Sequence, residues 1–85
     1  MESWLRCSSI KQGQFPGEYA VEASTSEGQL ISMFAPGDAV RVNENLIRVT
    51  VLDRSNDAVL VYLPAKPFEA SRTVRVSTGA LQLAG

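Results

Sequence analysis

Apolar and polar residues alternate with a period of two along most of this chain, and this pattern constrains the fold more than any other feature. Successive side chains of a β-strand point to opposite faces, so the alternation is typical of strands with one buried face. No stretch of ten residues keeps the spacing of an amphipathic helix. The pattern therefore predicts an all-β fold. The expected strands cover residues 19–25, 29–34, 46–52, 58–63 and 72–77, with 4–10 as a more polar sixth strand that suits a sheet edge.

Proline, glycine and polar residues mark the turns between these strands. Pro16-Gly17 fits the central positions of a type II turn, because proline sets φ and glycine accepts a positive φ. Residues 26–28 (SEG) are a hairpin signal, and Pro36-Gly37 predicts a turn that opens a single helical turn. Residues 53–57 (DRSND) are expected to join the two strands at the centre of the fold.

The length of the chain fits one small domain, residues 1–85, with a thin stability margin to which self-association would add. Five or six short strands suit a small, partly open β-barrel. The order of features in about the last 40 residues resembles an SH3-like barrel: strand, polar turn, central strand, loop, the VRV strand, the turn STGA and a last strand at 81–83. An oligonucleotide-binding barrel is the nearest alternative, although the helix that it carries between strands three and four has no clear place here.

Charge and cysteine content bear on partners and compartment. Eight basic and nine acidic residues give a formal net charge of -1, so no overall field attracts nucleic acid or an acidic membrane. Six of the eight basic residues are arginine, which is favoured for planar and stacking contacts. The single Cys7 cannot form an internal disulfide, and no segment resembles a signal peptide or is long enough to cross a membrane. The cytoplasm is the expected location, and no membrane contact is expected.

The residue types exclude most catalytic and metal chemistry. The chain has no histidine, which removes imidazole acid–base catalysis, histidine-activated nucleophiles and histidine metal ligands. One cysteine cannot assemble a structural zinc site, and no phosphate-binding glycine motif or calcium loop is present. Cys7 is interpreted as a half-buried apolar side chain, and Asp53 and Asp57 as carboxylates that satisfy turn N–H groups. We therefore expect no enzyme, no cofactor and no metal.

The segment TVRVSTGAL at 73–81 resembles, in layout, the strand-turn-strand that lines the pore of the plasmid-borne type II dihydrofolate reductases. Members of that family are SH3-like chains of similar size that form a tetramer around one shared active pore. The resemblance implies an oligomer with a site at its symmetry axis. Val74-Arg75-Val76-Ser77 stands where that family has Val-Gln-Ile-Tyr, so no catalytic residue is carried over.

Two phenylalanines lie in proline-containing loops, Phe15 in QFPGE and Phe68 in KPFEA. Loops run over the surface, so each side chain is expected either to fold back as a plug on an open barrel end or to form an exposed contact. Phe34 is expected in the core, and Tyr62 in the core or at the barrel rim.

The arginines near the chain's end form a second candidate surface. Arg72 and Arg75 are expected on opposite faces of their strand, and Arg75 would lie next to Arg48 if the two strands pair. Such a face is either a solvated surface that discourages edge pairing or a contact for a phosphate or carboxylate. The candidate binding residues are Phe15, Tyr19, Phe68, Arg72, Arg75 and Arg48.

These features favour a non-catalytic binding or assembly module that acts through protein contacts, with a foreign protein or a second copy as its partner. A nucleic-acid-binding barrel is the second hypothesis, although it would need several phosphate contacts and exposed stacking aromatics, so nucleic acid is not the expected partner. An oligomeric small-ligand-binding protein or pore-type enzyme is the third.

Overall fold

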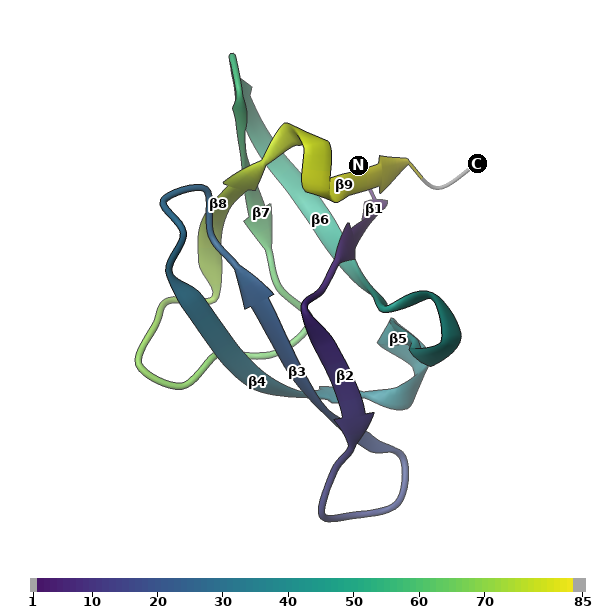
Figure 1. Ribbon diagram of the computed structural model, residues 1–85. Coiled ribbons are helices and arrows are strands. Elements are labelled where there is room, and N and C mark those ends of the chain that lie inside the picture. The colour runs from purple at the N-terminus through teal and green to yellow at the C-terminus, as the bar shows by residue number, and fades with distance from the viewer. Residues whose placement is uncertain (1, 84–85) are drawn as a thin grey trace.

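The computed structural model describes residues 2–83, which form two antiparallel β-sheets and no α-helix (Figure 1). The larger sheet has the strand order β8-β7-β6-β1-β9, and the short β5 pairs with the start of β6. Its strands are β1 (Glu2–Arg6), β5 (Val40–Arg41), β6 (Leu46–Ser55), β7 (Ala58–Tyr62), β8 (Thr73–Ser77) and β9 (Leu81–Leu83). The predicted all-β class is confirmed.

The smaller sheet has the strand order β2-β3-β4. Its strands are β2 (Ser9–Gln12), β3 (Glu18–Ser24) and β4 (Leu30–Pro36). Three single turns of 3-10 helix connect strands: η1 (Gly37–Ala39), η2 (Val42–Glu44) and η3 (Thr78–Ala80). The helical turn expected after Pro36 is therefore present.

The strand count differs from the expected five or six, because the structure divides residues 2–83 into nine strands. The segment 4–10 does not form one strand: the chain bends after Arg6, so that β1 enters the larger sheet and β2 the smaller one (Figure 1). β1 pairs with β6 on one side and β9 on the other, so the expectation of an edge holds only for β2.

Two predicted turns can be checked in atomic detail. Gly17 has a φ of 78°, and the Glu18 N–H donates to the Phe15 carbonyl at 3.2 Å, as a type II turn around Pro16-Gly17 requires. The expected turn at 53–57 is shorter than predicted, because β6 continues to Ser55 and only Asn56 and Asp57 separate it from β7.

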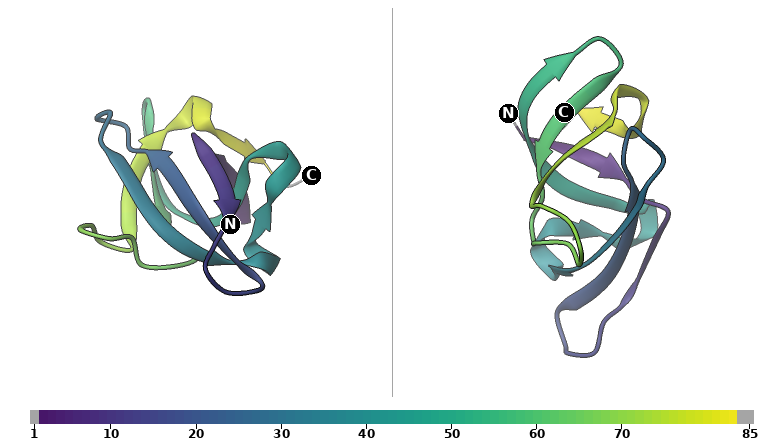
Figure 2. Two further views of the ribbon diagram at one scale, coloured as in Figure 1. Left: turned by 60° about the horizontal axis from the view of Figure 1, so that its bottom comes forward. Right: turned by 90° about the vertical axis from the view of Figure 1, so that its left-hand side faces the viewer.

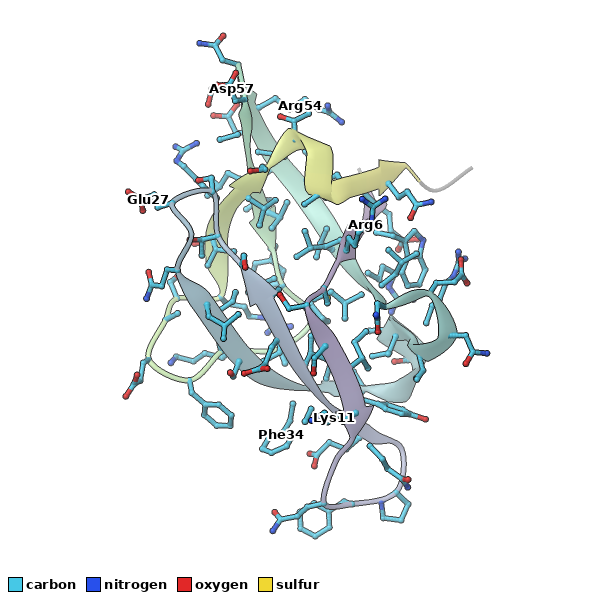
Figure 3. All side chains as sticks on the ribbon, in the orientation of Figure 1. Arg6, Lys11, Glu27, Phe34, Arg54 and Asp57 are labelled. Carbon is cyan, nitrogen blue, oxygen red and sulfur yellow. The ribbon has the colours of Figure 1, made fainter. Side chains whose placement is uncertain are left out.

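The two sheets pack against each other (Figure 2), and buried apolar side chains of both form one core. The charged side chains labelled in Figure 3, such as Arg6 and Lys11, point away from this core. The smaller sheet contributes Val21, Ala23, Ile31, Met33 and Ala35, and the larger sheet Leu5, Ile47, Val49, Val59, Val61 and Val76. On β7, Val59 and Val61 point inward and Tyr62 points outward, because consecutive residues of a strand alternate between faces.

Single hydrogen bonds, rather than a strand ladder, connect the two sheets beside β8 and β4. The Ser26 N–H donates to the Arg75 carbonyl at 2.8 Å, and the Phe68 N–H donates to the Ser32 carbonyl at 2.8 Å. Within residues 2–83 the strand pairings therefore form two separate sheets and no closed barrel.

Candidate functional site

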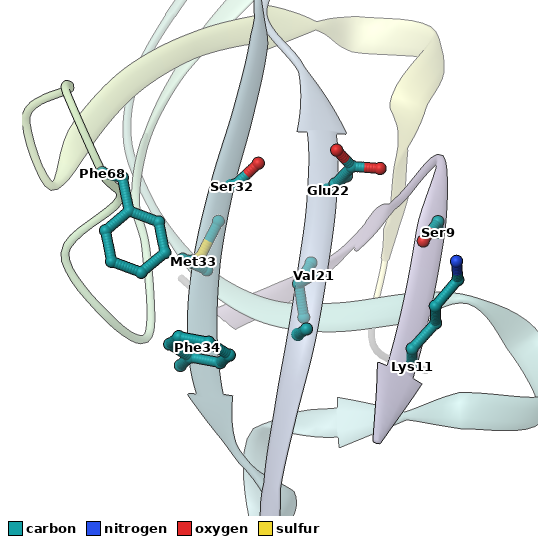
Figure 4. Close-up of a pocket in the computed structure, with 9 residues that line it drawn as sticks. Ser9, Lys11, Val21, Glu22, Ser32, Met33, Phe34 and Phe68 are labelled. Atoms are coloured by element: carbon teal, nitrogen blue, oxygen red, sulfur yellow. The ribbon is translucent and has the colours of Figure 1, made fainter. Parts of the chain in front are cut away.

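A groove lies on the outer face of the smaller sheet, and we call it the sheet groove (Figure 4). It has a volume of about 360 Å³. Phe34 and Phe68 form one wall, and Lys11 lies across the sheet on β2. The lining residues are Ser9, Lys11, Ala20, Val21, Glu22, Ser32, Met33, Phe34 and Phe68.

The strand register explains why there is room for a groove. Ala20 on β3 lies opposite Phe34 on β4 and opposite Lys11 on β2. The small alanine side chain between two long ones leaves a depression on the face of the sheet. Two residues along β3, Glu22 lies between Ser9 and Ser32, so small polar side chains flank its carboxylate.

Phe34 was expected in the core, and this prediction is wrong. Its neighbours Met33 and Ala35 point inward, so Phe34 points to the outer face and is 39% exposed. Its ring lies edge-on to that of Phe68, with ring centroids 5.5 Å apart and an interplanar angle of 86°. This T-shaped geometry is favourable for aromatic pairs.

Phe68 is held in this position by its backbone and by its neighbour. Its N–H donates to Ser32 on β4, which fixes the loop against the edge of the smaller sheet. Pro67 is fully buried, whereas the Phe68 side chain is 56% exposed. Phe68 is therefore exposed rather than folded back as a plug, and the buried residue of this loop is Pro67. The use of Phe68 as a binding contact stays a prediction. Sequence reasoning did not single out Pro67.

A second hollow, of about 350 Å³, lies on the outer face of the larger sheet. We call it the arginine hollow, because Arg48 and Arg72 both line it. Thr50 of β6 and Tyr62 of β7, which are paired across the two strands, lie between them. Asp38 and four apolar residues complete the lining: Pro36, Ala39, Leu63 and Pro64.

Arg72 is fixed by contacts with the strand that precedes its loop. Its Nε donates to the Leu63 carbonyl at 2.9 Å, and its Nη2 donates to the Pro64 carbonyl at 3.0 Å. The guanidinium lies over the Tyr62 ring, 4.4 Å from the centroid. A guanidinium held in this way is pre-organised, so it loses little conformational freedom on binding.

Arg48 is held from the other side of the hollow. Its Nη1 donates to the Asp38 carbonyl at 3.2 Å, and its Nε lies 3.6 Å from Oε2 of Glu2. Both side chains of this ion pair are partly exposed, so the pair contributes little to stability.

The expected neighbourhood of Arg75 is not observed. β8 pairs with β7 and not with β6, so β7 separates Arg75 from Arg48. Arg75 lies opposite Leu60 and is exposed, as expected, but it does not line the hollow. Arg72 precedes β8, and its guanidinium packs over the outward-facing ring of Tyr62. Strand alternation did not predict this position of Arg72 on the outer face.

The two remaining candidate residues lie outside both sites. Phe15 is 64% exposed in the turn between β2 and β3, and it does not line the sheet groove. Tyr19 is half-buried and packs against the core, so it is not a free contact.

Cys7 is buried, and its thiol donates to the Leu5 carbonyl at 3.5 Å. Burial raises the pKa of this thiol from 9.0 to about 12, and a backbone hydrogen bond with Ile47 offsets part of the shift. The nucleophilic thiolate is therefore strongly disfavoured at neutral pH.

Comparisons with protein-family models, curated proteins and solved structures give no match to this chain. Over residues 2–83, no group of three metal-ligating side chains gathers. The same part of the chain contains no helix of the length and apolar character needed to cross a membrane.

Proposed function

We propose that this chain is a non-catalytic binding module that holds an extended segment of a partner protein in the sheet groove. The observation that supports this most is the exposed Phe34–Phe68 pair at the wall of the groove. Aromatic side chains in a central pocket commonly dominate the energy of protein interfaces. We further propose that the two sheets form a single, partly open SH3-like barrel, with the bend between β1 and β2 as one of its corners.

The polar lining indicates the character of the partner. Lys11 and Glu22, of opposite charge, both line the groove, and no ion pair joins them in the described part of the chain. A peptide offers carbonyl oxygens to the Lys11 ammonium and N–H groups to the Glu22 carboxylate. The proposed occupant is therefore an extended peptide with one bulky apolar side chain beside Phe34 and Phe68.

The test is a selection of peptides from a random displayed library on the full chain, followed by affinity measurements with variants. We expect the selected peptides to carry a large apolar residue. Phe34→Ala and Phe68→Ala should each weaken their binding by about tenfold or more, as residues at an interface centre do. Phe15→Ala is the matched control, because Phe15 is a similarly exposed phenylalanine outside the groove.

Circular dichroism of each variant shows whether the fold is retained. Binding that is equally weak in all three variants, or unchanged in all three, would contradict the proposal. Light scattering over a concentration series distinguishes a second copy as the occupant. A dimer that Phe68→Ala dissociates would show that the groove serves self-association instead.

Nucleic-acid binding is the second candidate, and the distribution of arginines favours it. The described strands of the larger sheet carry five arginines, namely Arg6, Arg41, Arg48, Arg54 and Arg75, against only Glu2 and Asp53. Arg41 also lies over the Trp4 ring, 4.1 Å from its centroid. Binding of single-stranded oligonucleotide that weakens steeply with salt would support this candidate over the first.

A further inference from the structure

The arginine hollow holds more hydrogen-bond donors than the protein uses. Each guanidinium has five N–H groups. Arg72 donates two hydrogen bonds to carbonyls, and Arg48 donates one. The Nε of Arg48 also faces the Glu2 carboxylate, at 3.6 Å. The remaining N–H groups of both residues have no hydrogen-bond acceptor within the described residues, and neither has the Thr50 hydroxyl.

These donors lie around one concave space rather than on a flat surface. Arg48 and Arg72 both line the hollow, and Thr50 and Tyr62 are paired directly across β6 and β7 between them. The volume of about 350 Å³ is at the lower end of the range for small-ligand sites. The hollow therefore has the size of a small molecule, and two guanidinium groups against one lining carboxylate, Asp38, favour an anion.

We propose that the arginine hollow binds the phosphate group of a small phosphomonoester. A carboxylate can be satisfied by one guanidinium, whereas the three terminal oxygens of a phosphomonoester can accept from two guanidinium groups and a hydroxyl. The apolar lining, with Leu63 and Pro64, would contact the organic part of the ligand. This site is separate from the sheet groove and does not depend on the function proposed for it.

The Glu2–Arg48 ion pair shows that an oxygen anion is accepted beside Arg48. The Glu2 carboxylate and the Asp38 side chain formally offset the two positive charges of the hollow, so a ligand phosphate would compete with them. Glu2→Gln removes one of these charges while it keeps the size of the side chain. This variant should therefore bind the phosphomonoester more tightly than the unmodified chain.

The experiment is a titration of the full, isotope-labelled chain with phenyl phosphate, followed by two-dimensional amide NMR. We expect saturable shifts at Thr50, Tyr62 and Arg72, and weakening of about tenfold or more in Arg48→Gln, as for the loss of a charged hydrogen bond. Arg75→Gln is the matched control, because it removes an equal charge from the same sheet outside the hollow. Binding in this control should stay within about twofold, and Phe34→Ala should leave it unchanged.

Three further probes make the result decisive. The second pKa of a phosphomonoester is about 6, so binding should weaken from pH 7.5 to pH 5 as the ligand loses its second negative charge. Benzoate has the same ring with a carboxylate, and equal affinity for it would overturn the phosphate assignment.

Equal weakening of binding by Arg75→Gln would show a diffuse charge effect and would overturn the site. An oligonucleotide without terminal phosphate that binds more tightly, with shifts extending to Arg6 and Arg75, would assign this face to nucleic acid instead.

Discussion

Arg72 and Leu63 form two hydrogen bonds with each other across the base of the loop between β7 and β8. The Leu63 N–H donates to the Arg72 carbonyl at 2.9 Å, and the Arg72 Nε donates to the Leu63 carbonyl at 2.9 Å. In the second hydrogen bond the donor is the side-chain Nε of Arg72, whereas in a regular strand ladder the donor would be a backbone N–H. Since the same guanidinium also reaches the Pro64 carbonyl, Arg72 closes the loop that carries Pro67 and Phe68.

Arg72→Ala is therefore expected to destabilise the chain, although Arg72 is an exposed residue. Loss of its two side-chain hydrogen bonds and the contact with Tyr62 should lower the free energy of unfolding by about 1–2 kcal/mol. Urea denaturation followed by tryptophan fluorescence measures this change. Arg75→Ala removes an equally charged side chain that makes no such contacts within the described part of the chain, and the change should stay within about 0.5 kcal/mol. Equal effects of the two variants would show that Arg72 does not close the loop.

Pro67 should contribute more to the free energy of unfolding than Phe68, although its side chain is the smaller of the two. Pro67→Ala removes two buried methylene groups, so the free energy of unfolding should fall by about 1–3 kcal/mol. Phe68→Ala removes a ring that is 56% exposed, and should cost less than about 1 kcal/mol. Thermal melts of the two variants, side by side, check this order. A larger loss for Phe68→Ala would restore the expectation that Phe68 is the plug.

The alternation of residues predicted the strands well, but it could not decide every face. On β3, Val21 and Ala23 alternate with polar residues, so the inward face is evident from the sequence. On β4 both faces are apolar, because Ile31 and Met33 alternate with Leu30 and Phe34. Alternation shows which residues share a face of the strand. Only packing against the larger sheet decides which of the two faces of β4 is buried. The error for Phe34 follows from this ambiguity.

The two sites depend on contacts between distant segments, which a periodic pattern does not contain. The sheet groove needs Phe68 of one loop beside Phe34 of β4, and the arginine hollow needs Arg72 over Tyr62. The sequence identified Phe68, Arg48 and Arg72 as candidates through residue type and loop position. It could not decide whether β8 pairs with β6 or with β7. It therefore allowed Arg75 beside Arg48, whereas Arg72 is the arginine that shares the hollow with Arg48.

The buried hydroxyl of Ser3 is expected to make the unmodified chain less stable than a variant that lacks it. Ser3 points inward from β1, is fully buried, and its hydroxyl has no hydrogen-bond partner among residues 2–83. A buried hydroxyl without a partner loses its hydration with no compensation. Ser3→Ala should therefore raise the free energy of unfolding by about 1 kcal/mol, measured by urea denaturation. Ser55→Ala is the control for an exposed serine, and a loss of stability in Ser3→Ala would mean that the hydroxyl has a partner after all.

The thiol of Cys7 links stability to pH at the alkaline end. Below pH 9 the thiol is protonated in both the folded and the unfolded chain, since its pKa is 9.0 when unperturbed and about 12 in the fold. As the pH rises from 9 toward 12, the unfolded chain loses this proton while the folded chain keeps it. The free energy of unfolding should then fall by on the order of 1 kcal/mol per pH unit. The measurement is the difference in the free energy of unfolding between the unmodified chain and Cys7→Ala, which should shrink above pH 9.

Labelling of Cys7 with a disulfide reagent at pH 8 provides an independent check, because the folded thiol should react far more slowly than the thiol in guanidinium chloride. Rapid labelling of the folded chain would show that Cys7 is accessible as a thiolate.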